Sequence, residues 1–245
     1  MALLEVDKVN KAFGGVQANQ DVSIQVEEGA IVGLIGPNGS GKTTLFNSIV
    51  GTHPIDSGEV YFRGRPLSKL WTSVIARRGL LRTFQQTRIY GRMDCMQNML
   101  ISEPHRKDNV LDMFREHDPA LHERAEDLLE FVGLYEKRFM FAGELSFGQQ
   151  KLLEFAMALM NDPGMLLDEP TAGINPTLIN GLMDRLRRAN AERGVTLLVI
   201  EHNMRVIMDL AQHIYCMSHG RVLAEGRPEE VRDNPDVIDA YLGEQ

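Results

Sequence analysis

A glycine-rich stretch at residues 36–43 ends in a lysine and a threonine. It is composed of Gly36-Pro37-Asn38-Gly39-Ser40-Gly41-Lys42-Thr43, which fits the pattern of a phosphate-binding P-loop. Glycines let consecutive backbone N–H groups curl around an anion because no Cβ blocks that conformation. The lysine adds a positive charge for the β- and γ-phosphates, and the threonine hydroxyl is a ligand for Mg²⁺. We predict that residues 36–44, including Thr44, bind the phosphates of a nucleotide.

Two carboxylates follow a short apolar run later in the chain. Met165–Leu167 precede Asp168 and Glu169. A carboxylate at the C-terminal end of a buried parallel strand lies at the ligand crevice of an open α/β sheet. We predict that Asp168 belongs to the Mg²⁺ shell, through water, and that Glu169 orients or deprotonates an attacking water. A capped strand end is the alternative explanation of this pair.

The elements that must position these residues alternate between strand and helix. Alternating or continuous apolar runs predict strands, and apolar residues at helical spacing predict helices. Strands are expected at Leu3–Val9, Asp21–Val26, Ala30–Ile35, Gly58–Phe62, Met165–Leu167 and Val195–Ile200, with helices at Gly41–Val50, Pro176–Arg193 and Met204–Ala211. Residues 94–138 are expected to be helical, and Ile214–Met217 with Arg221–Ala224 to form a closing pair of edge strands. This alternation indicates a mostly parallel sheet with helical crossovers.

The composition excludes several classes of protein. The 245 residues carry a net charge of −8 and 43% apolar residues. An acidic chain is poorly suited to neutralise a nucleic-acid backbone, and two cysteines are too few for a disulfide scaffold. No uncharged apolar run reaches the roughly 18–20 residues of a membrane helix. We therefore expect an intracellular globular protein that binds no nucleic acid.

A third motif narrows the type of nucleotide-binding protein. Leu145-Ser146-Phe147-Gly148-Gln149-Gln150 opens a predicted helix, with its serine 22 residues before Asp168. In the order and spacing of these three motifs, the chain resembles the ATP-binding cassette (ABC) ATPases, whose signature is L-S-G-G-Q. Phe147 departs from the usual glycine. The resemblance implies that this segment, from Ser146 to Gln149, contacts the γ-phosphate of ATP bound to a second subunit. A serine N-cap is the alternative explanation of Ser146.

Further positions resemble functional residues of the same family. Gln85 resembles the glutamine that contacts Mg²⁺ and the attacking water, with neighbouring Gln86 as a rival. His202 resembles the switch histidine at the γ-phosphate. Phe13 resembles the aromatic residue that stacks on adenine, although a core phenylalanine beside a turn is the alternative. Asn175 occupies a loop between subunits where many relatives have aspartate.

The resemblance also implies an architecture. We expect an α/β P-loop NTPase fold with a mostly parallel core sheet, an antiparallel β subdomain and an inserted α-helical subdomain, in a single domain spanning residues 1–245. The core with the β subdomain would take residues 1–93 and 160–245, the helical signature subdomain about 94–159, and a C-terminal helical tail 227–245. One residue fewer than in many relatives separates Pro163 from Asp168.

The implied function is ATP hydrolysis, with ATP and Mg²⁺, coupled to transport. Three segments resemble the ATPases of branched-chain and hydrophobic amino-acid importers: Arg82–Gln85, Ile200–Met204 and Asn234–Glu244. Implied partners are transmembrane permease subunits, a second identical or different ATPase subunit and, indirectly, a periplasmic solute-binding protein. The chain would lie on the cytoplasmic face of the inner membrane. Alternatives are urea or amide import, lipopolysaccharide export, a regulatory ATP-driven dimer and a small-molecule kinase.

Two features of the sequence support separate hypotheses. Met93, Met96 and Met99 recur every third residue, and part of this stripe is expected to line a groove for the permease; packing inside the helical subdomain is the alternative. The 34 residues between Glu59 and Asp94 contain no acidic residue and eight basic ones. Part of that segment is expected to face the cytoplasmic leaflet or acidic permease loops, where each cation contributes about 1 kcal/mol. A solvated basic face without a partner is the alternative.

Overall fold

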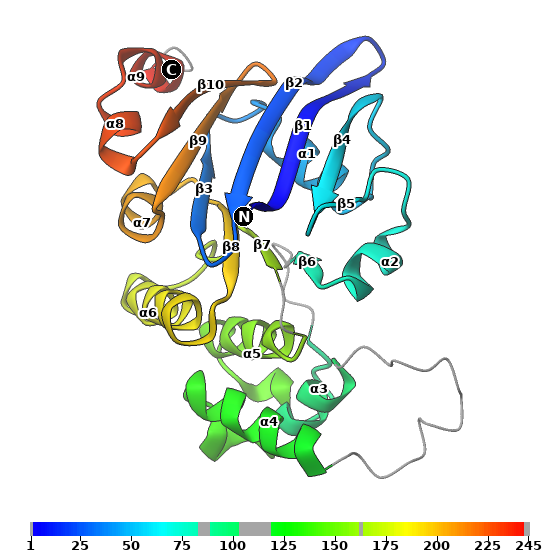
Figure 1. Cartoon of the computed structure of the whole chain (residues 1–245). Helices are drawn as coiled ribbons and strands as arrows, with labels where there is room; N and C mark the ends of the chain where they lie inside the picture. Colours follow the sequence, from blue (N-terminus) through cyan, green and yellow to red (C-terminus); the bar gives the residue numbers. More distant parts are fainter. Residues whose placement is uncertain (1, 83–88, 103–118, 162–163, 243–245) are drawn as a thin grey trace. The chain divides into compact units, whose positions relative to one another are not determined.

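A computed structural model describes residues 2–82, 89–102, 119–161 and 164–242 (Figure 1). The chain divides into two compact units. The first unit takes Met1–Arg82, Gly164–Thr171 and Leu186–Gln245, and the second takes Thr83–Pro163 and Ala172–Arg185. Among the described residues, no helix combines the length and the apolar character needed to cross a bilayer.

The first unit contains a four-stranded antiparallel sheet in the order β2-β1-β4-β5. Its strands are β1 (Ala2–Phe13), β2 (Val16–Glu27), β4 (Ser57–Phe62) and β5 (Arg65–Pro66). Gly14 and Gly15 both have positive φ angles, which permits a two-residue turn between β1 and β2. The first two strands are therefore longer than the alternating patterns predict.

The same unit contains a six-stranded sheet in the order β10-β9-β3-β8-β7-β6 (Figure 1). The strands are β3 (Ile31–Ile35), β6 (Leu80–Arg82), β7 (Gly164–Asp168), β8 (Thr196–Ile200), β9 (His213–Ser218) and β10 (Arg221–Gly226). All neighbours are parallel except β9 and β10. The predicted mostly parallel α/β architecture is confirmed. The predicted closing pair is found at one edge of this sheet, where β10 is the edge strand and β9 lies between β10 and β3.

Five complete helices, and the last part of α6 (Pro176–Arg193), accompany these sheets in the described part of the first unit. The complete helices are α1 (Lys42–Ile49), α2 (Thr72–Arg77), α7 (Met204–Leu210), α8 (Pro228–Arg232) and α9 (Pro235–Leu242). A single buried cluster joins residues of both sheets with Leu45, Phe46 and Ile49 of α1. Because α1 contributes to this core, the loop that precedes it is fixed to the end of β3.

The second unit is helical in its described part. It holds α3 (Cys95–Ile101), α4 (Pro119–Phe131), α5 (Phe147–Leu159) and the first part of α6 (Pro176–Arg193). Met96 and Met99 are 6% and 0% exposed, whereas Met93 is partly exposed. The hypothesis of a methionine-lined groove is therefore wrong for Met96 and Met99, which pack inside this unit.

Candidate functional site

The predicted P-loop connects the buried strand β3 to helix α1. Gly36 has a φ of 143°, and a Cβ added there would lie 2.1 Å from the backbone oxygen of Met217. Gly39 and Gly41 also have positive φ angles. Only glycine fits this close approach of the loop to β9 at Gly36, so the backbone is bent as an anion-binding loop requires.

Lys42 lies at the start of α1 with its ammonium group held by the loop. Its Nζ donates to the carbonyl oxygens of Gly36 and Pro37, at 2.7 and 2.8 Å, and to Oγ of Ser40 at 3.1 Å. The residue is 5% exposed. The loop therefore carries a buried positive charge at a helix N-terminus, a combination that favours phosphate. The next residue, Thr43, is exposed.

Two side chains that the sequence analysis did not assign to the site support this loop. The backbone N–H of Gly36 donates to the hydroxyl of Tyr241 in α9 at 2.8 Å. Asn19 of β2 donates through Nδ2 to the carbonyl of Gly41 at 3.1 Å.

A pocket of about 310 Å³ adjoins the loop, lined by Pro37, Asn38, Gly39, Ser40, Ser218, His219, Asp239 and Ala240.

Asp168 ends strand β7, as predicted, and is 8% exposed. Its Oδ2 accepts from Nη2 of Arg82 at 2.5 Å, and Nη1 of the same arginine donates to Oδ1 of Asn47 at 2.5 Å. Asn47 belongs to α1, so Arg82 links the helix of the P-loop to the carboxylate. Sequence analysis assigned Arg82 no role in the site, because an arginine at the end of a strand does not by itself indicate its partner.

Glu169 and His202 meet at the ends of the neighbouring strands β7 and β8. Oε1 of Glu169 lies 2.6 Å from Nε2 of His202, and the backbone N–H of Glu169 donates to the carbonyl of Ile200 at 2.9 Å. Glu169 has a φ of 49°, a conformation that costs a residue with a Cβ about 1 kcal/mol or more and is concentrated at functional sites. The sequence predicted both residues but not their contact.

A buried carboxylate ties together the loops that follow these two strands. Glu201 is 3% exposed, and its Oε1 accepts from the backbone N–H and the hydroxyl of Thr171, at 2.9 and 2.6 Å. Glu201 precedes His202, and Thr171 follows Glu169 by two residues. This pair therefore positions the two loops that carry the Glu169–His202 contact.

Phe13 ends strand β1 with a ring that is accessible to a ligand. The residue is 45% exposed. Its ring stands edge-on to His53 at 5.4 Å, and Nζ of Lys11 lies 5.2 Å from the ring centroid. An exposed ring with an adjacent cation suits stacking on a heteroaromatic base better than the alternative of a core phenylalanine.

The predicted signature segment lies in the second unit, at the start of α5. Ser146 is the N-cap, with Oγ accepting from the N–H of Gln149 at 3.4 Å while Oε1 of Gln149 accepts from the N–H of Ser146 at 3.1 Å. Phe147 is 44% exposed and Gly148 is buried. Ser146 is thus the N-cap that the alternative explanation requires, and a hydroxyl at this end of a helix also suits an anion.

The remaining predicted positions are placed only in part. Asn175 is exposed in the second unit, just before α6, where its carbonyl accepts from the N–H groups of Leu178 and Ile179. Gln85 and its rival Gln86 lie outside the described residues.

Known proteins similar to this chain share its length and fold. The sequence model of the ABC transporter family matches residues 19–172, and a model named for the branched-chain amino acid ATP-binding cassette transporter matches residues 221–245. BraF of Pseudomonas aeruginosa, a high-affinity branched-chain amino acid transport ATP-binding protein, is 40% identical over 99% of this chain and 98% of its own length. LivG of Escherichia coli K12, described in the same words, is 37% identical over 99% and 98%.

Two solved structures of ABC transporter cassettes also match this chain over almost its whole length. The ADP conformation of an ATP-binding cassette of an ABC transporter matches with a TM-score of 0.88 and 34% identity, over 99% of each chain. A nucleotide-free cassette from an ABC transporter matches with a TM-score of 0.85 and 34% identity, over 98% of this chain and 99% of that one.

Proposed function

This chain belongs to the ABC transporter family, and we propose from that premise that it powers the import of branched-chain or other hydrophobic amino acids. It is an ATPase of the cassette type. The proposed substrate class is supported by the printed functions of BraF and LivG and by the family match over the C-terminal residues 221–245.

We assign ATP binding to the loop from Gly36 to Thr44 and to Phe13. The loop offers its backbone N–H groups and the Lys42 ammonium to the phosphates, and Phe13 offers its exposed ring to adenine. Support comes from the bent glycine backbone, the burial of Lys42 and the exposure of Phe13.

Mg²⁺ fits the oxygen groups near this loop. The exposed hydroxyl of Thr43 and the carboxylate of Asp168 are the oxygen donors that this ion prefers. They would hold it, Asp168 through water, together with Gln85. When bound, the ion neutralises charge on the phosphates. In this structure the positive charge beside Asp168 is that of Arg82.

Glu169 is the proposed catalytic base. Its carboxylate orients the attacking water and accepts a proton from it, and His202 holds the carboxylate in place and contacts the γ-phosphate. The observation that carries this assignment is the 2.6 Å contact between Oε1 of Glu169 and Nε2 of His202 at the ends of adjacent strands. The left-handed backbone at Glu169 supports it, because strain of this kind is retained where the geometry is needed.

The test is Glu169→Gln in the assembled transporter. Removing a general base slows the reaction by about 10²–10⁴-fold, while the amide keeps the shape of the side chain, so ATP should remain bound and trap a closed dimer. Glu225→Gln, on the exposed strand β10, is the matched control and should keep full turnover. Full ATPase turnover in Glu169→Gln would remove Glu169 from this role.

The second half of each site is proposed to come from another ATPase subunit. Ser146, Phe147, Gly148 and Gln149 would contact the ATP of that subunit, and Asn175 would hydrogen-bond across the interface without the charge of an aspartate. This proposal is supported by the solved dimer of an ATP-binding cassette bound to ADP and phosphate, which matches with 26% identity and a TM-score of 0.74; transmembrane permease subunits are the proposed membrane partners. We retain as proposals a periplasmic solute-binding protein, the position on the cytoplasmic face of the membrane, and the division into core (1–93, 160–245), helical subdomain (94–159) and tail (227–245).

Purification of the chain from detergent-solubilised membranes tests the transport assignment. We expect it to carry permease subunits, and we expect leucine, isoleucine or valine with the solute-binding protein to stimulate ATP hydrolysis. If only urea or amides, or only lipopolysaccharide, stimulated ATP hydrolysis, the proposed amino-acid substrate would be wrong and that compound would be the transported class. Purification with no membrane protein would favour a regulatory dimer instead.

A further inference from the structure

The structure sorts the eight basic residues of the acid-free segment into groups with different surroundings. Arg82 points inward to Asp168, Arg92 lies in the second unit, and Arg88 lies outside the described residues. The other five stand in the first unit on β5, α2 and the turns beside them: Arg63, Arg65, Lys69, Arg77 and Arg78. Four of these five residues are exposed, and Arg78 is half-buried.

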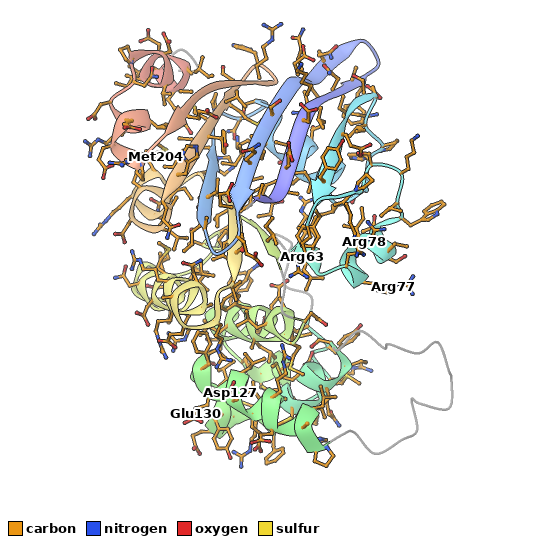
Figure 2. All side chains as sticks on the ribbon, viewed as in Figure 1. Arg63, Arg77, Arg78, Asp127, Glu130 and Met204 are labelled. Carbon is orange, nitrogen blue, oxygen red and sulfur yellow. The ribbon has the colours of Figure 1, made fainter. Side chains whose placement is uncertain are left out.

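Pairing of β4 with β5 and one side-chain hydrogen bond bring these cations onto one face. Phe62 pairs with Arg65 across the turn that carries Arg63. Nη1 of Arg78, at the end of α2, donates to the carbonyl of Pro66 in β5 at 3.1 Å. Figure 2 shows Arg63, Arg77 and Arg78 on the same side of the first unit, around β5 and α2.

The chain's one tryptophan stands at the other end of α2. Trp71 is 81% exposed and is the N-cap residue of this six-residue helix, which at 1.5 Å per residue is about 9 Å long. The helix is anchored from below by Ile75, which is 1% exposed. The indole is therefore held outward on an ordered element, about one short helix away from Arg77 and Arg78.

We propose that this face, defined by Trp71 with Arg63, Arg65, Lys69, Arg77 and Arg78, binds the anionic headgroup surface of a lipid bilayer. Indole rings favour the headgroup level of a membrane because one part is apolar and the other can hydrogen-bond. Lysine and arginine near an anionic leaflet are attracted to its negative surface potential. This face therefore offers both an indole for the headgroup level and cations for the anionic surface.

A lipid surface fits this face better than an acidic protein does. The central part of a protein interface is depleted in charged residues and buries its aromatic residues in packed pockets, whereas here one exposed indole is accompanied by five cations. The charge on the rest of the chain favours one orientation at the membrane. The net charge is −8, so the remainder carries −13 without these five cations and is repelled by an anionic surface. This repulsion favours an orientation with Trp71 and the five cations toward the bilayer.

The inference stands on exposed residues of the first unit and needs no transport assignment, so its test uses lipid vesicles without permease or ATP. Trp71 is the sole tryptophan, so its emission, excited at a wavelength where the five tyrosines do not absorb, reports this face alone. The full chain is titrated with vesicles of phosphatidylcholine, with or without 30% phosphatidylglycerol, at low and high salt. We expect a blue shift of the emission, and quenching by brominated lipid, with the anionic vesicles at low salt.

Two pairs of adjacent arginines supply the variant and its control. Each cation near an anionic leaflet contributes about 1 kcal/mol, or about fivefold in partitioning, so Arg77→Gln with Arg78→Gln should lower vesicle partitioning about 25- to 30-fold. Arg187→Gln with Arg188→Gln, on the partly exposed face of α6, removes the same charge elsewhere and should not lower it. Unchanged melting temperatures confirm that both proteins are folded.

Several results would overturn the proposal. These are an emission that does not shift with anionic vesicles, a shift that is equal for neutral vesicles, and equal losses in the two arginine pairs. A blue shift seen only with detergent-solubilised permease, and never with lipid, would assign the face to a protein partner instead. Failure of this test leaves the ATPase and its substrate class unaffected.

Discussion

Replacement of Arg82 by methionine tests the buried ion pair that links the P-loop helix to Asp168. The side chains of Arg82 and Asp168 are 8% and 10% exposed, and Nη2 and Oδ2 are 2.5 Å apart. Methionine keeps most of the aliphatic stem and removes the charge, so the carboxylate is left buried without its counter-ion. Breaking a buried pair in this way costs about 3–5 kcal/mol. We expect the free energy of unfolding to fall by that amount without nucleotide and Mg²⁺.

Urea unfolding measured by circular dichroism is the assay. A loss of about 4 kcal/mol with a slope near 2.5 kcal/mol per molar urea lowers the midpoint by about 1.6 M. The matched control is Arg188→Met, since Arg188 is also ion-paired, to Glu192, but the two side chains are 46% and 50% exposed. An exposed pair of this kind contributes about 0–1 kcal/mol.

A double-mutant cycle separates the ion pair from the packing of the arginine stem. Asp168→Asn removes the charge of the partner, so the double variant with Arg82→Met leaves no buried charge unpaired and should be more stable than the sum of the single losses predicts. The reasoning is refuted if Arg82→Met costs no more than Arg188→Met, or if the two losses at Arg82 and Asp168 are additive.

Three further predictions concern the loop, the cap and the thiols. Gly36→Ala should destabilise the chain by more than about 2 kcal/mol, measured by thermal unfolding. The new Cβ would lie 2.1 Å from the Met217 carbonyl oxygen, and a residue with a Cβ is also strained at a φ of 143°. Ser146→Ala should lower stability by about 1 kcal/mol through loss of the N-cap, measured by urea unfolding. Burial raises the pKa of Cys95 and of Cys216 to about 11, from an ordinary value of 9.0, so the folded chain retains protons that unfolded thiols lose. Stability should therefore be unaffected by these groups below about pH 9 and fall between about pH 9 and 11, by up to about 1.4 kcal/mol per pH unit for each thiol, measured as urea midpoints against pH.

The two substitutions each have a control variant, and the thiol prediction has a labelling test. Gly39→Ala adds a Cβ with nothing within 4 Å and should cost less than Gly36→Ala; equal losses would contradict the steric argument. Ser146→Gly should cost only a few tenths of a kcal/mol, as glycine is accepted at an N-cap. Rapid labelling of both thiols in the folded chain at pH 8 would contradict their burial.

Local sequence alone determined the parts of the site that are held by local interactions. Bent glycine loops, apolar strands and an N-cap with its partner three residues on depend on neighbours along the chain. For this reason the P-loop, the strand before Asp168 and the capped helix at Ser146 are where the sequence predicts them. The resemblance to the ABC ATPases that the sequence analysis states rests on those same motifs.

Tertiary structure alone decided the contacts between residues far apart in the sequence. Arg82 meets Asp168 because β6 lies beside β7, and Tyr241 meets Gly36 because α9 returns to the loop. The type of a side chain does not reveal which distant residue it will contact, because that contact depends on which strands become neighbours. For the same reason Met96 and Met99, equivalent to Met93 by spacing, are buried while Met93 is partly exposed.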